Sequence, residues 1–174
     1  MREENGISYL HILADDGHGE ESGARKSIKV QGKRLRVPIH SAVIRCGFLD
    51  YVAQRRASGA SRGRMFPDLK ADSRGRLSGN WSKWWGRWTR RELGITDRRK
   101  VFHSFRHGWK DAARAAGVDV AISDAITGHS MAGAGAGYGT RGNAGYPLRV
   151  LQEAVEKISF DLTLSPMMPT AGQR

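Results

Sequence analysis

The chain has 174 residues, 29 of them Lys or Arg and 17 Asp or Glu, and carries a formal net charge of +12. That length suits one domain, and a composition of 39% hydrophobic and 26% charged residues excludes both a membrane protein and a wholly disordered chain. The acidic N-terminus does not resemble a signal peptide, and a single cysteine, Cys46, excludes an internal disulfide, so we expect a cytoplasmic protein.

The N-terminal part of the sequence predicts a small sheet. Residues 6–13, 27–30 and 35–39 are rich in β-forming side chains, and a glycine-containing turn separates the second run from the third. Short runs of this kind predict a three-stranded antiparallel meander. Lys29 would lie beside its second turn.

The next stretch predicts a helix and then a loop. His40 or Ser41 can cap a helix that ends near Gly59. Apolar residues repeat at helical spacing along it and predict a core-facing side: Ile44, Phe48, Leu49 and Val52. Residues 62–79 contain Gly, Pro, Asp and Ser and predict a loop.

A tryptophan-rich helix follows, for which Ser78 is the expected N-cap. Four tryptophans share one face of it: Trp81, Trp84, Trp85 and Trp88. Such a stripe is typical of a core-facing side. The alternative is a surface on which nucleic-acid bases stack.

Two more helices are expected before the chain becomes rich in glycine. The first spans residues 103–116, with Phe105 and Trp109 on its apolar side and Gly117 as its terminator. The second is capped by Asp119 and ends just before His129.

The C-terminal part predicts a loop, a helix and a tail. Residues 130–145 are rich in Gly and Ala and predict a mobile segment. Pro147 begins the last helix, and residues 159–174 are expected to be disordered. The sequence therefore predicts a single domain over residues 1–158.

The positive charge is concentrated in two stretches. Residues 25–40 hold six bases and no acid, and residues 62–114 hold fifteen bases and five acids. A basic stripe of this kind is typical of a surface that meets a polyanion, and nucleic acid is the leading candidate. The alternative is a soluble domain whose basic side chains are solvated or paired.

Four local features carry candidate chemistry. His103 and Arg106 are three residues apart on one helix, so an imidazole and a guanidinium share a face. His129 follows a glycine helix terminator, Tyr138 is a lone aromatic residue among small ones, and Lys29 belongs to the predicted hairpin. Taken singly, the first two features and Lys29 are more often ordinary surface features. The hydroxyl of Tyr138, an aromatic residue without apolar neighbours, invites a functional explanation.

Two competing assignments are weaker. Tyr146 is the other candidate nucleophile, but it immediately precedes a proline at a helix start, where an aromatic residue more often packs against the helix. His103 and His107 have the spacing of a zinc pair but lack the glutamate and third ligand of a catalytic site, so no metal is expected.

In their order and approximate spacing, these features resemble the catalytic domain of the tyrosine recombinases, the phage integrase family. The resemblance covers roughly residues 6–158. The matching stretches are KVQGKRLRVPIH, MFPDL, FHSFRHGWKDAARAAGV, ITGHS and GYGT. It implies an α+β fold that is mainly α, with a small three-stranded antiparallel sheet followed by a helical catalytic bundle.

The resemblance also implies a reaction, which is phosphoryl transfer on DNA without metal or cofactor. Tyr138 would attack a backbone phosphate and form a 3′-phosphotyrosyl link. Arg106 and His129 would stabilise the charge on the non-bridging oxygens. His103 would act as acid and base for the tyrosine, and Lys29 would protonate the departing 5′ oxygen.

Double-stranded DNA is therefore the expected partner. The basic residues expected to bind it are Lys33, Arg34, Arg36, Lys100 and Arg141. The resemblance also implies self-association, as a tetramer on DNA in which the helix after the nucleophile docks on a neighbouring subunit; the alternative is packing within its own chain. Neither a membrane nor a small-molecule substrate is expected.

The sequence departs from the family pattern at its start. The family's first catalytic arginine lies in a Gly-x-Arg-x-x-Glu segment upstream of the first strand, and no such segment precedes residue 6. We therefore expect an N-terminally truncated recombinase that lacks this arginine. The alternatives are a catalytically inactive DNA-binding remnant of an integrase and an RNA-binding or ribosome-associated basic protein.

Overall fold

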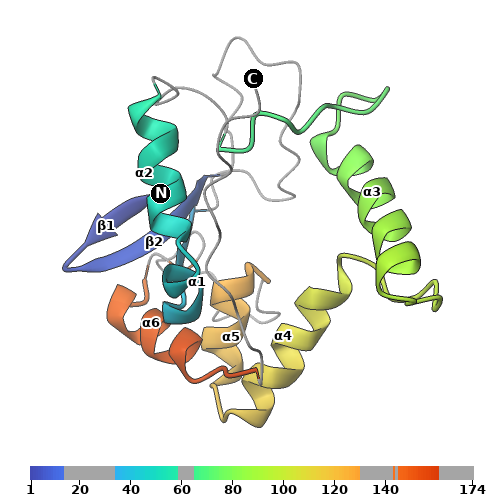
Figure 1. Cartoon of the computed structure of the whole chain (residues 1–174). Coiled ribbons are helices and arrows are strands. Elements are labelled where there is room, and N and C mark those ends of the chain that lie inside the picture. The colour runs from blue at the N-terminus through green and yellow to red at the C-terminus, as the bar shows by residue number, and fades with distance from the viewer. Residues whose placement is uncertain (14–33, 59–64, 130–142, 144, 161–174) are drawn as a thin grey trace.

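The computed structural model describes residues 1–13, 34–58, 65–129, 143 and 145–160 (Figure 1). The fold is α+β, as expected, with one three-stranded antiparallel sheet and about half of the described residues in helices. The elements are β1 (Arg2–Glu4), β2 (Ile7–Leu13), β3 (Arg34–Pro38), α1 (Ser41–Arg45), α2 (Phe48–Ala57), α3 (Leu77–Glu92), α4 (Ser104–Ala115), α5 (Val120–Thr127) and α6 (Leu148–Glu156). No helix in these ranges is both long and apolar enough to cross a membrane.

The sheet has the strand order β1-β2-β3. Its first strand is the charged segment Arg2–Glu4, which was not predicted because it lacks β-forming side chains. Asn5 and Gly6 join it to β2 with φ angles of 51° and 76°, the left-handed pair that tight hairpins require. The predicted strand at residues 27–30 lies outside the described residues.

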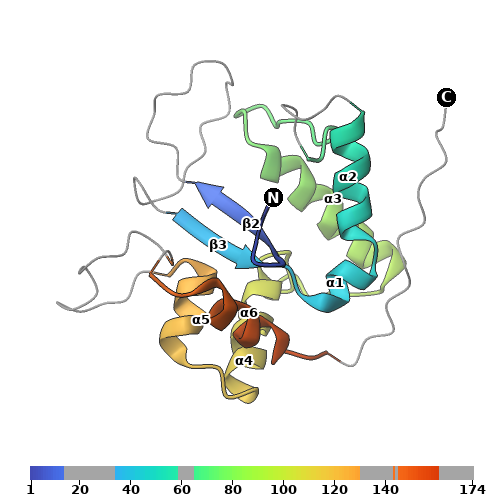
Figure 2. The ribbon, with the colours of Figure 1, turned by 90° about the vertical axis from the view of Figure 1, so that its left-hand side faces the viewer.

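The core lies between the sheet and three helices, which gather beside the strands in Figure 2. Its buried members are Tyr9, Ala113, Val118, Ile126, Leu148, Leu151, Ala154, Val155 and Ile158. Leu151 of α6 is fully buried. The apolar face of α6 therefore packs within its own chain.

The helix ends in the C-terminal part follow the sequence signals. Asp119 Oδ1 accepts hydrogen bonds from the backbone N–H groups of Ala121 and Ile122, at 2.8 and 3.2 Å, so it caps α5 as predicted. Gly117 and Gly128 end α4 and α5 with φ angles of 67° and 71°. These glycines turn the chain where the helical pattern stops.

The helix expected from residue 41 to about 59 is interrupted, so that prediction was wrong. Gly47 adopts φ 84°, which separates α1 from α2. Within the predicted core face only Val52 is buried, and Ile44 is exposed. His40 is the N-cap, since its Nδ1 accepts from Ala42 N at 2.9 Å.

Ser78 does not cap the tryptophan helix, which begins one residue earlier at Leu77. Asp72 instead orders the chain that enters α3. Its Oδ1 accepts from the backbone N–H groups of Arg74 and Arg76 at 2.9 and 2.8 Å. Asp72 therefore fixes the turn before α3, and no side chain of the N-cap residue Arg76 caps the helix.

The prediction that the tryptophans of α3 belong to the core was also wrong. None of the four is fully buried, and Trp84 is 43% exposed. Phe105, expected on the apolar side of α4, is 59% exposed. In Figure 1, α3 stands away from the sheet and from α6, which explains why its rings do not reach the core.

Candidate active site

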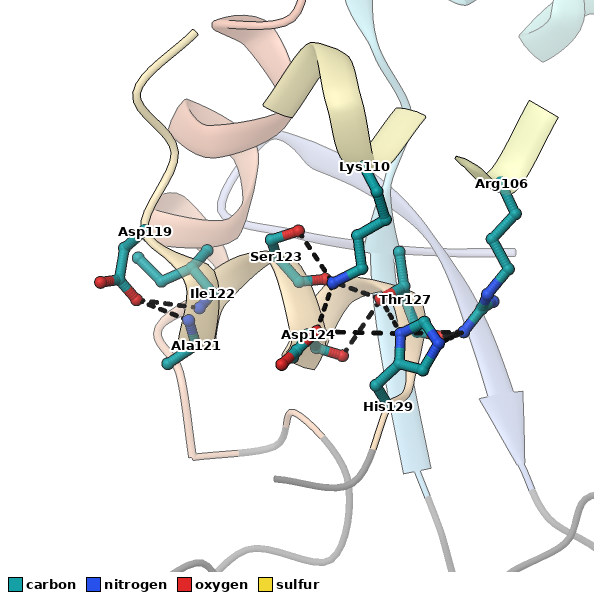
Figure 3. A network of polar contacts seen from close by, with 9 residues as sticks. All are labelled: Arg106, Lys110, Asp119, Ala121, Ile122, Ser123, Asp124, Thr127 and His129. Carbon is teal, nitrogen blue, oxygen red and sulfur yellow. Dashed lines mark hydrogen bonds and ion pairs between the residues drawn. The ribbon is translucent and has the colours of Figure 1, made fainter. Parts of the chain in front are cut away.

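Arg106 and His129 come together although 23 residues separate them in sequence. Arg106 projects from α4, and His129 follows α5 (Figure 3). The Arg106 Nη2 atom lies 3.3 Å from each ring nitrogen of His129. It also donates to the backbone carbonyl of Thr127. Two of the motifs singled out in the sequence thus form one cluster of a guanidinium and an imidazole.

The turn after α5 sets the place of the His129 ring. The backbone N–H of His129 donates to Asp124 O at 2.9 Å, closing the helix end at Gly128. Thr127 Oγ1 lies 2.8 Å from Ser123 O and 2.8 Å from His129 Nδ1. Whichever acceptor takes the single hydroxyl proton, these contacts hold Nδ1 of the His129 ring beside Thr127.

An ion pair between Lys110 and Asp124 lies beside the His129 ring, and the sequence analysis missed it. Lys110 Nζ donates to Asp124 Oδ1 and, at 3.2 Å, to Ser123 Oγ. Asp124 Oδ1 is also 3.8 Å from His129 Nδ1. The side chains of Lys110 and Asp124 are only 22% and 24% exposed. Lys110 follows Arg106 by four residues on α4, and this spacing is the one signal that could have pointed to it.

His103 lies immediately before α4, one turn from Arg106. Its ring packs edge-on against His107, with centroids 5.2 Å apart. The part of the chain that the structure describes contains no hydrogen bond from the His103 ring to Arg106 or His129. His103 is exposed, so its imidazole is open to solvent beside the cluster.

Four of the predicted site residues lie outside the described residues: Lys29, Lys33, Tyr138 and Arg141. Arg34 and Lys100, both predicted to bind DNA, are exposed. The side chain of Arg36 is 18% exposed and is held within the protein. Its Nη2 donates to Tyr146 O at 2.6 Å, and its Nη1 lies 3.6 Å from Glu4. A contact between Arg36 and DNA stays a prediction.

The chain that follows the Tyr138 segment is fixed to the sheet by a residue that the sequence analysis also missed. Asn143 is completely buried, and its backbone N–H donates to Arg34 O at 3.2 Å. Tyr146, the competing nucleophile, is partly buried and packs against the core, as a residue at a helix start often does. The segment that contains Tyr138 is thus bounded by His129 on one side and Asn143 on the other.

The sheet is electropositive around His11 on its central strand, β2. Burial lowers the pKa of His11 below its ordinary value of 6.5, and the nearby guanidinium groups of Arg2, Arg34 and Arg36 lower it further. A field of this sign disfavours an added proton and favours an anion.

The Arg106–His129 cluster can hold an oxyanion. Among the described residues, the hydrogen bonds of Arg106 all come from Nη2, so Nε and Nη1 can serve a bound anion. Arginine binds phosphate through two parallel N–H groups, and the His129 ring lies beside the same guanidinium. Within the ranges that the structure describes, no group of three or more His, Cys, Asp or Glu side chains could hold a metal ion.

No family model, no curated protein and no solved structure matches this chain.

Proposed function

We propose that this chain breaks and rejoins DNA in the manner of a tyrosine recombinase, through a 3′-phosphotyrosyl intermediate. The observation that carries the proposal is the convergence of Arg106, on α4, and His129, in the turn after α5, which meet within 3.3 Å. An arginine beside an imidazole, on a chain of net charge +12, suits a backbone phosphate better than a neutral ligand.

The proposed reaction assigns one task to each group. The Tyr138 oxygen attacks phosphorus, forming the Tyr138 Oη–P bond while the bond from phosphorus to the 5′ oxygen breaks. His103 accepts the phenolic proton, and Lys29 donates a proton to the 5′ oxygen. Arg106 and His129 stabilise the negative charge that the non-bridging oxygens carry in the transition state. Rejoining reverses these steps with a 5′ hydroxyl as nucleophile, so no metal or external energy source is needed.

The geometry around the cluster supports a preorganised site. Thr127 holds both Arg106 Nη2, through its carbonyl, and His129 Nδ1, through its hydroxyl. The oxygens of Thr127 thus orient a guanidinium and an imidazole toward each other before any substrate arrives. Fixed donors of this kind avoid reorganisation during the reaction, which is where much of the rate acceleration of enzymes originates.

Double-stranded DNA is the proposed substrate, and a multimer on that DNA is the proposed active assembly. Arg34 on β3 and Lys100 before α4 are exposed and available for phosphate contacts. Binding through such contacts releases counterions, so duplex affinity should fall as the salt concentration rises.

Covalent capture tests the proposal. The protein is incubated with pooled duplexes that carry a nick and a randomised central sequence, so that the cleaved fragment diffuses away and the adduct accumulates. We expect an SDS-resistant protein–DNA adduct that is lost in Tyr138→Phe and kept in Tyr146→Phe. Arg106→Gln should reduce its formation rate by at least about 100-fold, because one charged donor is removed.

An adduct that persists in Tyr138→Phe would overturn the assignment of the nucleophile. Salt-sensitive duplex binding without any adduct would overturn the enzymatic proposal and leave a DNA-binding protein without catalysis. Preferential binding of RNA in competition with duplex DNA would contradict both.

A further inference from the structure

A cluster of aromatic rings lies on α3 and at the start of α4, apart from the core. We call it the aromatic patch, and its members are Trp81, Trp84, Trp85, Trp88, Phe102 and Phe105. Neighbouring ring centroids in it are between 4.8 and 6.4 Å apart. The rings therefore pack mainly on one another.

The aromatic patch is open to solvent on one side. None of its members belongs to the buried core cluster. Trp84, Phe102 and Phe105 are 43%, 45% and 59% exposed. Contiguous exposed apolar surface is rare on soluble proteins and marks a binding site.

Basic side chains surround these rings. Residues 77–106 hold eight Lys or Arg and two Asp or Glu. On α3, Arg87 follows Trp84 and Arg91 follows Trp88 by three residues, a spacing that makes each pair neighbours on the helix surface. Lys100 is exposed two residues before Phe102. The partner of the aromatic patch should accordingly be both aromatic and anionic.

We propose that the aromatic patch binds single-stranded DNA, with unstacked bases on Trp84, Phe102 and Phe105 and with phosphates at the flanking basic side chains. Rings next to basic residues are the usual means by which proteins hold unpaired strands, because every base offers a π-face. In a duplex those faces are covered by neighbouring base pairs. A second copy of this chain fits less well, since the like charges of Arg87 and Arg91 would face each other across a symmetric interface.

The aromatic patch and the candidate active site share helix α4. Phe105 directly precedes Arg106 on α4, and Phe105 packs against Trp85 at 5.4 Å. The choice of DNA over RNA rests on the proposed function, whereas the stacking of unpaired bases does not.

Fluorine NMR of the full chain labelled with 5-fluorotryptophan tests the proposal. A thymidine oligomer of about 12 nucleotides is compared with an abasic oligomer of the same length, which has the phosphates but no bases. We expect the thymidine oligomer to shift the Trp84 resonance, assigned with Trp84→Phe, and to bind at least about 5-fold more tightly than the abasic one. Trp109, which packs against the core, supplies an internal resonance that should not move.

Substitutions extend the test. Trp84→Ala and Phe105→Leu should each weaken oligomer binding by about 5- to 100-fold. Trp84→Phe should retain most of the affinity. Phe160→Ala, which removes a ring that is 54% exposed elsewhere, should leave it unchanged. An unshifted Trp109 resonance in each variant shows that the fold is intact.

Equal affinity for the thymidine and abasic oligomers would overturn the proposal, because the bases would then contribute nothing. A Trp84 resonance that moves with protein concentration alone would assign the aromatic patch to a second copy instead. Tighter binding of a matched uridine oligomer would overturn the choice of DNA. None of these results bears on whether Tyr138 forms a covalent adduct with nicked duplexes, so failure here and failure of the proposed function are distinguishable.

Discussion

Asn143 pairs with the backbone of Arg36 through both atoms of its side-chain amide. Its Nδ2 donates to Arg36 O, and its Oδ1 accepts from Arg36 N, each at 2.7 Å. Because β3 is an edge strand, a buried side chain here takes the place of a further strand and covers groups that would otherwise be open to pairing. The same contact fixes the chain that follows the proposed nucleophile segment.

Replacing Asn143 by Ala should destabilise the protein by about 1–3 kcal/mol, because two backbone groups of Arg36 lose their partners. Urea unfolding measures the change. Asn80→Ala is the matched control, since that exposed amide donates only to the carbonyls of Lys70 and Ala71 at a loop. A loss of stability no larger than that of the control would contradict a structural role for Asn143.

Gly128 is required by its backbone angle and by its surroundings. It adopts φ 71°, and a Cβ added there would lie 2.8 Å from Leu35 Cδ1 on β3. Gly128→Ala should cost about 1–2 kcal/mol for the left-handed backbone alone, plus the displacement of Leu35. Gly117→Ala provides the comparison, because Gly117 has φ 67° but nothing within 4 Å of an added Cβ.

Thermal unfolding of the two variants should therefore show the larger loss for Gly128→Ala. In the double variant Leu35→Ala/Gly128→Ala, the clash between the added methyl group and the Leu35 side chain is removed. Its loss of stability should therefore be smaller than the sum of the losses in Leu35→Ala and Gly128→Ala. If Gly128→Ala and Gly117→Ala lose the same stability, Leu35 moves aside without cost.

The sequence predicted those features of the fold that depend on local signals. Asp119 and Gly128 bound α5 because a capping carboxylate and a left-handed glycine act within a few residues. Apolar residues of α6 likewise lie at helical spacing in the sequence, and Leu148, Leu151 and Val155 among them form its buried face.

What the sequence did not predict depends on contacts distant in the chain. The tryptophans from Trp81 to Trp88 have the spacing of a core-facing helix. Whether that face is covered depends on where the helix lies in the fold, and the spacing of residues does not determine the position of the helix. Asn143 gave no local pattern and Lys110 gave only its spacing from Arg106, because their partners are 107 and 14 residues away. Of the candidate site, the pair of Arg106 and His129 was anticipated from motif order, and the residues that hold it were not.

Asp124 joins Lys110 to the His129 ring, so its removal should affect stability and site geometry together. Asp124→Ala leaves a largely covered ammonium group without its carboxylate and should cost about 1–3 kcal/mol. It should also change the ¹⁵N shifts of the His129 imidazole. Asp111→Ala breaks the exposed Asp111–Arg114 pair and should stay within about 1 kcal/mol of the parent with no change in those shifts. If both variants leave the His129 resonances in place, Asp124 does not position that ring.

His11 should make the stability of the fold depend on pH in one direction. Its pKa is lowered in the folded protein by burial first and then by Arg2, Arg34 and Arg36, so the unfolded chain binds the proton more readily. The free energy of unfolding should therefore rise with pH up to about 6.5, the ordinary pKa of histidine. The stability that the neutral His11 ring contributes should be lost as the pH falls through its lower pKa in the folded protein.

Urea midpoints measured from pH 4 to pH 8 should accordingly show a smaller rise below pH 6.5 in His11→Gln than in the parent chain. Added salt at about 0.5 M should reduce the difference only in part, because salt screens the three guanidinium groups but leaves the burial of the ring unchanged. Since burial is the larger cause, complete loss of the difference in salt would mean that the charges of Arg2, Arg34 and Arg36 dominate instead. A parent chain whose stability falls as the pH rises through this window, relative to His11→Gln, would contradict the lowered pKa itself.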